Sequence, residues 1–378
     1  MRLLGSSLSV DEVRPKIREL VNQLFRDVPS GAGRGGNVRL SHKDLERVLT
    51  EGAAWMVEHE YGEPDDLTHS EESGAIEGAD PSAVSDRAKK RGLPQIGTLG
   101  SGNHFLEVQY VERIFEPQIA QALGLYENEI AVLIHSGSRG LGHQVCTDYL
   151  RDMDDGMRRY GIDLPDRQLA CVPVHSKEGQ SYLAAMRAAA NFAWANRQGI
   201  AHFTRGAFKR IFGEEETLRV IYDVCHNIAK LERHKVDGRE RQVMVHRKGA
   251  TRAFPAGRPE VPDAYKAFGQ PVLIPGSMGT ASWVLVGAEG SMQDTFGTTC
   301  HGAGRVMSRT AAKKSAYAAN ARQRLEDQGI IVRSESLDGI TEEIPEAYKD
   351  VDEVIDVVVN AGLAKRVARL KPIGVIKG

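Results

Sequence analysis

One stretch of this sequence, a histidine followed by glycines and arginines, suits chemistry on a phosphate. His301 stands before Gly302 and Gly304, and Arg305 and Arg309 follow four residues apart. Glycines let the backbone approach a ligand closely, and the start of a helix would offer free N–H groups to a phosphate. Both arginines would share one face of that helix and hold an anion. The stretch therefore indicates either a phosphate site with an imidazole at its mouth or a glycine turn beside a histidine that has no role.

Three more histidines stand close to apolar runs that resemble strands. His104, His135 and His226 each follow such a run. Strands that deliver polar residues into loops are a common way to build a site. Three neutral imidazoles could bind a transition metal such as Zn²⁺ or Mn²⁺, although a single histidine in such a place is more often structural. Asn103 and Asn227, next to two of them, could orient a ligand or a phosphate.

Three other motifs offer weaker indications. The segment 235–238 (Lys-Val-Asp-Gly) matches the pattern of a lysine nucleophile in ATP-dependent ligases, but Asp-Gly between two strand-like runs favours a hairpin turn. The segment 136–140 (Ser-Gly-Ser-Arg-Gly) lacks the elbow of a serine nucleophile, so its serines suit loop or phosphate contacts. The small residues of 275–280 could offer backbone N–H groups to an anion. No Walker A sequence is present.

The composition limits which classes of protein this chain can belong to. The chain has 378 residues, 41% of them hydrophobic, which can support a real core. The net charge of −2 gives no global basic field, so any nucleic acid would be held by local clusters. Four scattered cysteines without a CxxC pair indicate a reducing compartment. With no signal-like start and no long apolar run, we expect a cytoplasmic protein that does not contact a membrane.

Periodic patterns predict a single α+β domain over residues 1–378, with central β-sheets flanked by helices. The expected helices share apolar residues at helical spacing and lie at 15–26, 41–56, 181–198, 311–325 and 351–359. The expected strands are short apolar runs near 96–99, 130–134 and 218–224.

Taken together, these motifs resemble the RtcB family of GTP-dependent RNA ligases, which act in tRNA splicing and RNA repair. The resemblance extends from Met1 to Gly378. The stretches that carry it, in chain order, are Gly100–His104, His135–His143, His226–Asn227, Pro275–Thr280, His301–Arg305 and Gly374–Gly378.

The resemblance implies a role for each of these sites. His301 would attack the α-phosphorus of GTP and carry GMP as a phosphoramidate. The ligands of two Mn²⁺ ions would include His104, His135 and His226. The residues of the nucleotide pocket would be Asn103, His104, Glu107, Asn227, Pro275, Gly276, Ser277, Met278, Ser282, Gly302, Ala303, Gly304 and Lys377. The side chains that hold RNA phosphates would be Arg139, Arg197, Arg305 and Arg309.

The family reaction has three stages. An RNA 2′,3′-cyclic phosphate is opened to a 3′-phosphate, GMP passes from the histidine to that phosphate, and the 5′-hydroxyl of a second RNA displaces GMP. RNA and GTP are therefore the expected partners, with an archease-like activator as a further one. In-line displacement at phosphorus explains why metals and arginines matter more here than a conventional acid and base.

The sequence departs from the family pattern at one point. The family carries an Asp-x-x-Cys-Gly motif, which supplies metal ligands, upstream of the segment equivalent to Met1–Leu4. This sequence begins after that point, so we expect an N-terminally incomplete domain that lacks roughly the first hundred family residues. Such a chain would have doubtful activity by itself. It would be a fragment, through a misplaced start, an interrupted gene or a split from a separate N-terminal segment. Two other functions stay open from the sequence. A non-catalytic remnant would bind nucleotide or RNA without forming a covalent adduct, and a metal-dependent phosphoesterase would use the three histidines without His301.

Overall fold

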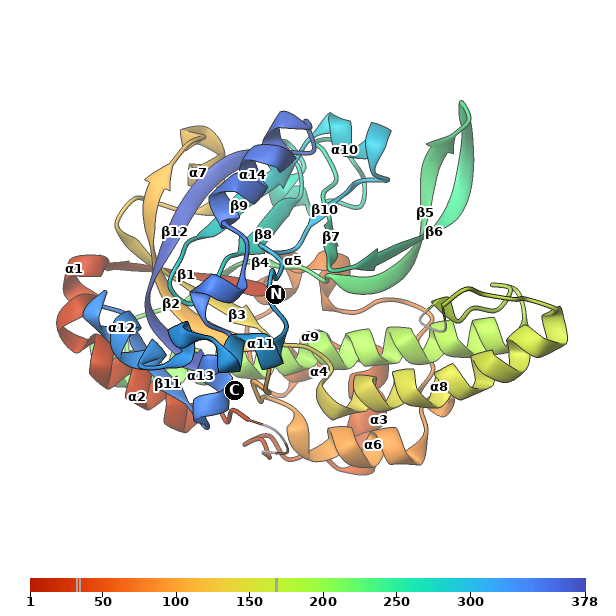
Figure 1. The fold of residues 1–378 in the computed structure, drawn as a ribbon, viewed down its shortest axis with the longest axis horizontal. Coiled ribbons are helices and arrows are strands. Elements are labelled where there is room, and N and C mark those ends of the chain that lie inside the picture. The colour runs from red at the N-terminus through yellow and green to blue at the C-terminus, as the bar shows by residue number, and fades with distance from the viewer. Residues whose placement is uncertain (32, 34, 167–168) are drawn as a thin grey trace.

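A curled, eight-stranded β-sheet forms the centre of the computed structural model, which describes residues 1–31, 33, 35–166 and 169–378 (Figure 1). The strand order is β4-β1-β3-β2-β12-β9-β8, all antiparallel, and β11 pairs in parallel with β12. The strands are β1 (Arg2–Ser9), β2 (Phe105–Ile114), β3 (Glu129–His135), β4 (Arg219–Asp223), β8 (Pro271–Pro275), β9 (Ser282–Gly287), β11 (Ile331–Ser334) and β12 (Ala364–Lys377).

The sheet is buried on both faces, which explains its nearly continuous apolar strands. In β3, for example, Val132 and Ile134 face one core while Ala131 and Leu133 face the other. The first core packs against α2 and α9, and the second contains Leu123 of α7. The sheet thus serves as a fixed platform from which loops at the strand ends project.

The helices surround this platform and confirm the α+β class. Their bounds are α1 (Val10–Val13), α2 (Ile17–Asp27), α3 (His42–Glu51), α4 (Ala53–Glu58), α5 (Asp65–Thr68), α6 (Asp86–Gly92), α7 (Pro117–Leu123), α8 (Arg139–Tyr160), α9 (Lys177–Phe212), α10 (Glu289–Asp294), α11 (Arg309–Lys314), α12 (Ala321–Asp327), α13 (Leu337–Thr341) and α14 (Val351–Asn360). No described helix has the length and apolar character needed to cross a lipid bilayer.

Most of the predicted helices are present, but with different ends. The helices expected at 15–26 and 351–359 are confirmed as α2 and α14, and the one at 181–198 is the middle of α9. The helix expected at 41–56 is divided into α3 and α4, because Gly52 has a positive φ of 60° and ends α3.

Two predicted elements are wrong. The expected helix at 311–325 is two short helices, α11 and α12, interrupted by a 3₁₀ turn at Ala316–Ala318 and by Asn320 in the left-handed conformation. The run at 96–99 is a buried loop, not a strand. Its backbone bonds to other loops and side chains: the Leu99 N–H donates to the Pro29 carbonyl (2.9 Å).

Two further strand pairs lie outside the main sheet. The strands β5 (Asn227–Val236) and β6 (Arg239–Lys248) form a hairpin that projects from the body of the protein (Figure 1). Its turn residues Asp237 and Gly238 both have positive φ, 50° and 76°, as a two-residue type I′ turn requires. The hairpin interpretation of 235–238 is therefore confirmed. The second pair, β7 (Ala250–Arg252) and β10 (Thr298–Cys300), leads directly to His301.

The close packing behind β9 predicts that Gly287→Ala will destabilise the fold. A Cβ at Gly287 would overlap the backbone carbon and oxygen of Ala253, and overpacking against backbone typically costs about 1–3 kcal/mol. Chemical denaturation should therefore show a lower free energy of unfolding. Gly206→Ala is the matched control, because a Cβ in that helix would meet only the tip of Arg210 at 3.8 Å; it should raise stability by about 0.5–1 kcal/mol. Equal stability of the two variants would contradict the prediction.

Candidate active site

Four histidine side chains lie close together, each at or near the end of a strand. His135 is the last residue of β3, and its partner across the ladder is Phe105, the first residue of β2, so His104 lies beside it. His226 follows β4 by three residues, and His301 follows β10 directly. The antiparallel sheet explains the meeting of His104 with His135, because the start of one strand lies beside the end of the next.

The imidazole rings form a continuous row. The ring centroids of His104 and His135 are 6.0 Å apart, and those of His135 and His226 are 4.9 Å apart. The two Nε2 atoms of His135 and His226 approach to 3.2 Å. His226 then stacks on His301, with 4.9 Å between centroids and 11° between planes. The predicted nucleophile and the three predicted metal ligands thus lie together.

Burial keeps these rings neutral. It lowers the pKa of His104 to about 3, helped by the nearby charges of Arg139 and Lys377. Burial and the neighbouring imidazoles hold the pKa values of His135 and His226 well below 6.5, and burial also lowers the pKa of His301. At neutral pH each ring therefore has one unprotonated nitrogen, which a metal ligand or a nucleophile needs.

The donor chemistry of the row suits a borderline transition metal. The Nδ1 atoms of His104, His135 and His301 are buried and have no hydrogen-bond partner among the described residues, and unpaired imidazole nitrogens are typical ligands for Zn²⁺ or Mn²⁺. In the part of the chain that the structure describes, however, no three His, Cys, Asp or Glu side chains have the geometry of a metal site. The metal ligands therefore stay a prediction.

Arg197 lies beneath this row instead of on an RNA-accessible surface. Its guanidinium is buried in α9 and donates to both carboxylate oxygens of Asp223 (2.6–3.0 Å) and to the Ser136 carbonyl (3.2 Å). Arg2 also donates to Asp223, at 2.8 Å. The prediction that Arg197 holds RNA phosphate disagrees with this placement, because every direction of its guanidinium faces protein. Arg197 instead fixes the ends of β3 and β4, next to His135 and His226.

Two contacts hold the loop that carries His301. The Ala303 N–H donates to the Pro275 carbonyl (3.1 Å), which joins the loop to the end of β8. On its other side, Gly249 lies against the His301 ring, and the Gly249 N–H donates to the Asn227 side chain (2.8 Å). Asn227 is exposed and lies at the His301 loop, outside the small cavity described next.

Beside the histidines lies a small cavity of about 10 Å³, roughly one water molecule. It is lined by six of the predicted nucleotide-pocket residues and by three others. The predicted six are Asn103, Glu107, Gly276, Ser277, Met278 and Lys377, and the other three are Phe105, Glu343 and Tyr348. A nucleotide would fit only after the lining opens.

Charges are balanced closely around this cavity. Burial raises the pKa of Glu107 to about 7, and burial also lowers the pKa of Lys377. Burial alone would raise the pKa of Glu343, but Lys377, Tyr348 and Arg309 together lower it. One buried carboxylate, Glu343, thus faces several cations at the cavity, and a ligand that brings negative charge could replace it.

Arg305 and Arg309 converge on that same carboxylate. Arg305 lies 3.2 Å from Glu343 and 5.0 Å above the Tyr348 ring, and Arg309 donates to Glu343 at 3.0 Å. Their predicted helical arrangement is wrong, because α11 begins only at Arg309, with Ser308 as its cap, and Arg305 lies in the loop before it. The helix start that we expected directly after His301 is therefore absent there. The two arginines still meet, through Glu343.

Arg139 is the third predicted RNA-contacting arginine near the site. It is partly buried and donates to the Thr98 hydroxyl (2.9 Å), and burial lowers its pKa to about 10. A Cβ on Gly100 would overlap both Arg139 and His104, so glycine is needed where these side chains meet. Arg139 thus lies directly beside the row of histidines.

The turn at 275–280 is largely closed on itself. The Gly276 N–H donates to the Ala281 carbonyl (3.0 Å) and the Ser277 N–H to the Thr280 hydroxyl (2.8 Å). Since these donors are already occupied, the turn offers fewer N–H groups to an anion than the sequence predicts. Ser282 reaches the cavity indirectly, because Gln109 donates both to Ser282 (2.9 Å) and to Glu107 (2.7 Å).

Sequence reasoning missed Phe105, Glu343 and Tyr348. Phe105 directly follows Asn103 and His104, so its position beside two predicted site residues could have indicated it. Glu343 and Tyr348 lie in a polar loop between α13 and α14 that has no recognisable motif. Only the fold brings that loop to the cavity, where the Tyr348 hydroxyl donates to Asn103 (3.3 Å) and to Glu343.

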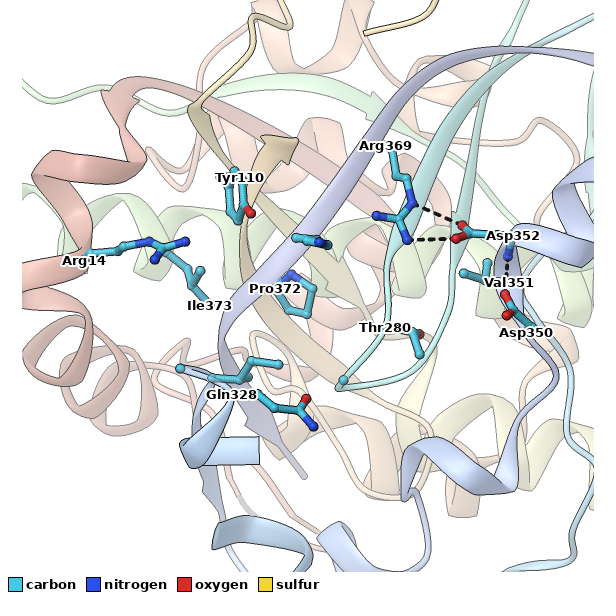
Figure 2. A pocket seen from close by; sticks show the side chains of 14 residues that line it. Arg14, Tyr110, Thr280, Gln328, Asp350, Val351, Asp352, Arg369, Pro372 and Ile373 are labelled. Atoms are coloured by element: carbon cyan, nitrogen blue, oxygen red, sulfur yellow. Dashed lines mark hydrogen bonds and ion pairs between the residues drawn. The ribbon is translucent and has the colours of Figure 1, made fainter. Parts of the chain in front are cut away.

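A larger cavity of about 470 Å³ lies at another place on the sheet, against β2 and β12 (Figure 2). Arg14 and Tyr110 line one side, and Asp352 pairs with Arg369 on the other (2.8 Å). Its lining mixes both signs of charge and includes none of the four histidines. Thr280 borders it, so the 275–280 turn separates this cavity from the small one.

Known proteins and one protein family match this sequence over its whole length. The profile of the family described as tRNA-splicing ligase RtcB matches residues 1–378. The tRNA-splicing ligase RtcB of Thermococcus kodakarensis is 58% identical over 381 residues, which cover 100% of this chain and 79% of that protein. The proteins of the same name from Archaeoglobus fulgidus and Pyrococcus abyssi are each 55% identical and are covered over 79% and 42% of their lengths.

The buried histidines predict that stability falls in mild acid. Between about pH 7 and about pH 5 the unfolded chain protonates rings that the fold keeps neutral, since their native pKa values lie below 6.5. The free energy of unfolding should therefore fall with decreasing pH, by up to about 1.4 kcal/mol per pH unit for each extra proton on the unfolded chain. Urea unfolding at several pH values measures this slope. His135→Gln should reduce it, whereas replacing the exposed His175 by Gln should not; an unchanged slope in His135→Gln would contradict the prediction.

The buried pair beneath the histidines predicts a large effect of Asp223→Asn. The neutral amide would leave Arg2 and Arg197 without their shared counter-charge, and breaking a buried pair typically costs about 3–5 kcal/mol. Thermal and urea unfolding would measure this loss. Asp356→Asn is the control, because Asp356 pairs with Arg366 near the surface, where a pair contributes at most about 1 kcal/mol. Similar losses of unfolding free energy in the two variants would contradict the prediction that the Asp223 ion pairs stabilise this region.

Proposed function

The chain belongs to the RtcB family of tRNA-splicing ligases, and from this we propose that it ligates RNA through a covalent nucleotide intermediate on His301. The observation that carries the proposal is the row of four neutral imidazoles that ends at His301. A nucleophilic histidine must keep a free ring nitrogen, and burial of the His301 ring favours its neutral form. The stacked His226 ring supports its orientation.

GTP is the proposed nucleotide. Its base would enter the small cavity, where Asn103, Glu107 and Lys377 can satisfy polar atoms of a purine. The present volume of this cavity requires an opening movement, and the Glu343–Tyr348 pair is the element best placed to move. Gly276 is required by the turn itself, because a Cβ there would overlap the Ala281 carbonyl oxygen and the Thr280 hydroxyl.

Mn²⁺ is the proposed metal. His104, His135 and His226 would hold it, since their rings are neutral and unpaired nitrogens are available on two of them. A bound divalent metal would neutralise phosphate charge during displacement at phosphorus. The protein contributes the fixed strand ends that hold these rings, and Arg197 and Asp223 support those ends from below.

The proposed reaction follows the three stages of the family. Water would first open the RNA 2′,3′-cyclic phosphate to a 3′-phosphate. His301 would attack the α-phosphorus of GTP, so that pyrophosphate leaves and GMP stays on the ring nitrogen. His301 gives up GMP to that phosphate, so that the bond from its ring nitrogen to phosphorus breaks as the new phosphoanhydride bond forms. The 5′-hydroxyl of a second RNA then forms the phosphodiester bond and GMP leaves. Arg139, Arg305 and Arg309 would bind the RNA phosphates, and Arg305 and Arg309 are already held near the cavity through Glu343.

A covalent-labelling experiment tests this function. Incubation with α-labelled GTP and Mn²⁺ should place label on the wild-type chain, and the bond should be acid-labile and base-stable, as expected for a phosphoramidate. His301→Ala should lose the label completely, because no other side chain can replace the nucleophile. The control is His175→Ala, which removes an exposed histidine far along the sequence and should label like the wild type.

The same samples distinguish the other possible functions. Label that persists in His301→Ala would contradict the assignment of the nucleophile. Saturable GTP or RNA binding without any label in the wild type would favour a binding protein. Phosphoesterase turnover that survives His301→Ala but is lost in His104→Ala would favour a hydrolase. Calorimetry with Mn²⁺ alone gives a further readout, in which His135→Ala should bind the metal at least ten-fold more weakly.

A further inference from the structure

The β5–β6 hairpin, residues 227–248, projects from the active-site region and is called the basic arm below (Figure 1). Directly opposed residues of an antiparallel pair point to the same face, so the ladder defines two faces. The outer face carries Leu231, Arg233 and Lys235 of β5, all exposed, with Leu231 48% exposed. Opposite them on β6 lie Met244, Gln242 and Glu240.

The root of the basic arm is fixed by buried ion pairs on its inner face. Lys230 contacts Glu71 at 2.7 Å, and Arg247 contacts Glu232 at 2.6 Å. These charges are already neutralised inside the protein and are not available to a ligand. They hold the arm in a set direction relative to the body.

The exposed charges of the basic arm are mainly positive. The basic ones are Arg233, Lys235, Arg239, Arg241 and Lys248, and the acidic ones are Asp237 and Glu240. The exposed charge is therefore +3, whereas the whole chain carries −2. On the outer face, Arg233 and Lys235 lie about 7 Å apart, because a strand rises about 3.4 Å per residue, and Lys248 lies at the root. Arg239 and Arg241 lie at the tip on the other face, opposite Val236 and His234.

The basic arm is continuous with the active site. Asn227 at its root accepts a hydrogen bond from Gly249, and Gly249 lies against the His301 ring. Lys248, the partner of Asn227 across the ladder, is the basic residue nearest to this root. A ligand that extends from His301 along the arm would meet Lys248 first and the basic residues of the tip last.

We propose that the outer face and tip of the basic arm bind the phosphate backbone of single-stranded RNA that extends from the end held at His301. The inference rests on the proposed function, because RNA ends are its substrates. Clustered Lys and Arg bind phosphates without sequence preference. A single strand fits better than a duplex, because its unpaired bases are free to rest on apolar side chains while its phosphates contact the basic ones. The exposed Leu231 and the partly exposed Met244 opposite it add an apolar patch on which a base can rest.

A charge-neutralised arm tests the inference. In the full chain, Arg233, Lys235, Arg239 and Arg241 would all be replaced by Gln, which leaves the buried root unchanged. Fluorescence anisotropy with a labelled single-stranded RNA that has a 5′-hydroxyl and a 3′-phosphate should show at least ten-fold weaker binding. The slope of log affinity against log salt should shrink by about 2–3, since each lost contact to single-stranded nucleic acid removes about 0.7.

A matched control separates the arm from total charge. Four exposed basic residues elsewhere, Lys43, Arg87, Lys90 and Lys365, would also be replaced by Gln. This variant loses the same charge and should bind RNA within about two-fold of the wild type and keep the wild-type salt slope. Thermal unfolding of both variants checks that each one is folded. Equal RNA affinity of the arm variant and the wild type would overturn the inference and leave the arm as a surface for another partner.

Labelling of His301 with GTP, which needs no RNA, is measured in the same preparations. If the wild type and the arm variant both carry label and the arm variant binds RNA more weakly, the inference is supported. If both carry label and their RNA affinities are equal, only the inference is overturned. If neither carries label, the proposed chemistry is overturned, while the comparison of their RNA affinities still decides the role of the arm.

Discussion

The buried pair between Arg197 and Asp223 is the interaction on which the site depends. Arg197 comes from α9, Asp223 from β4, and Arg2 of β1 shares the same carboxylate. A charged group in the interior is tolerated only when its hydrogen bonds are satisfied. Arg197 meets this condition, because it also donates to the Ser136 carbonyl. Three elements are thereby fixed at the point where His135 and His226 emerge. Neutral rings can lie beside one another there because buried charged groups keep the backbone in place.

The opposite wall of the site follows a different physical rule. Glu343 there faces Arg305, Arg309 and Lys377, so one buried carboxylate balances several cations. This arrangement is stable only while the carboxylate stays or while another anion takes its place. The small cavity thus lies beside a buried carboxylate that several cations share.

How far the sequence predicts the site depends on how local each signal is. His135 and His226 follow strand-like runs and could be predicted together, and Asp237–Gly238 specifies its turn by its own backbone preference. Arg197 and Glu343 could not be placed from the sequence. Arg197 resembles a surface arginine until α9 is seen to pass beneath the sheet, and Glu343 gains its partners only through the loop between α13 and α14. The helix expected at 311–325 failed because Asn320 and a 3₁₀ turn interrupt a favourable composition.

The position of β12 has a consequence for how the site is completed. This strand lies between β2 and β9, and Lys377 near its end lines the cavity opposite Phe105. Without β12, the strands β4-β1-β3-β2 and β9-β8 would have no ladder between them and would leave open edges, which are prone to pair wrongly. The small cavity is therefore complete only once β12 lies between these two sets of strands, because Lys377 forms part of its lining.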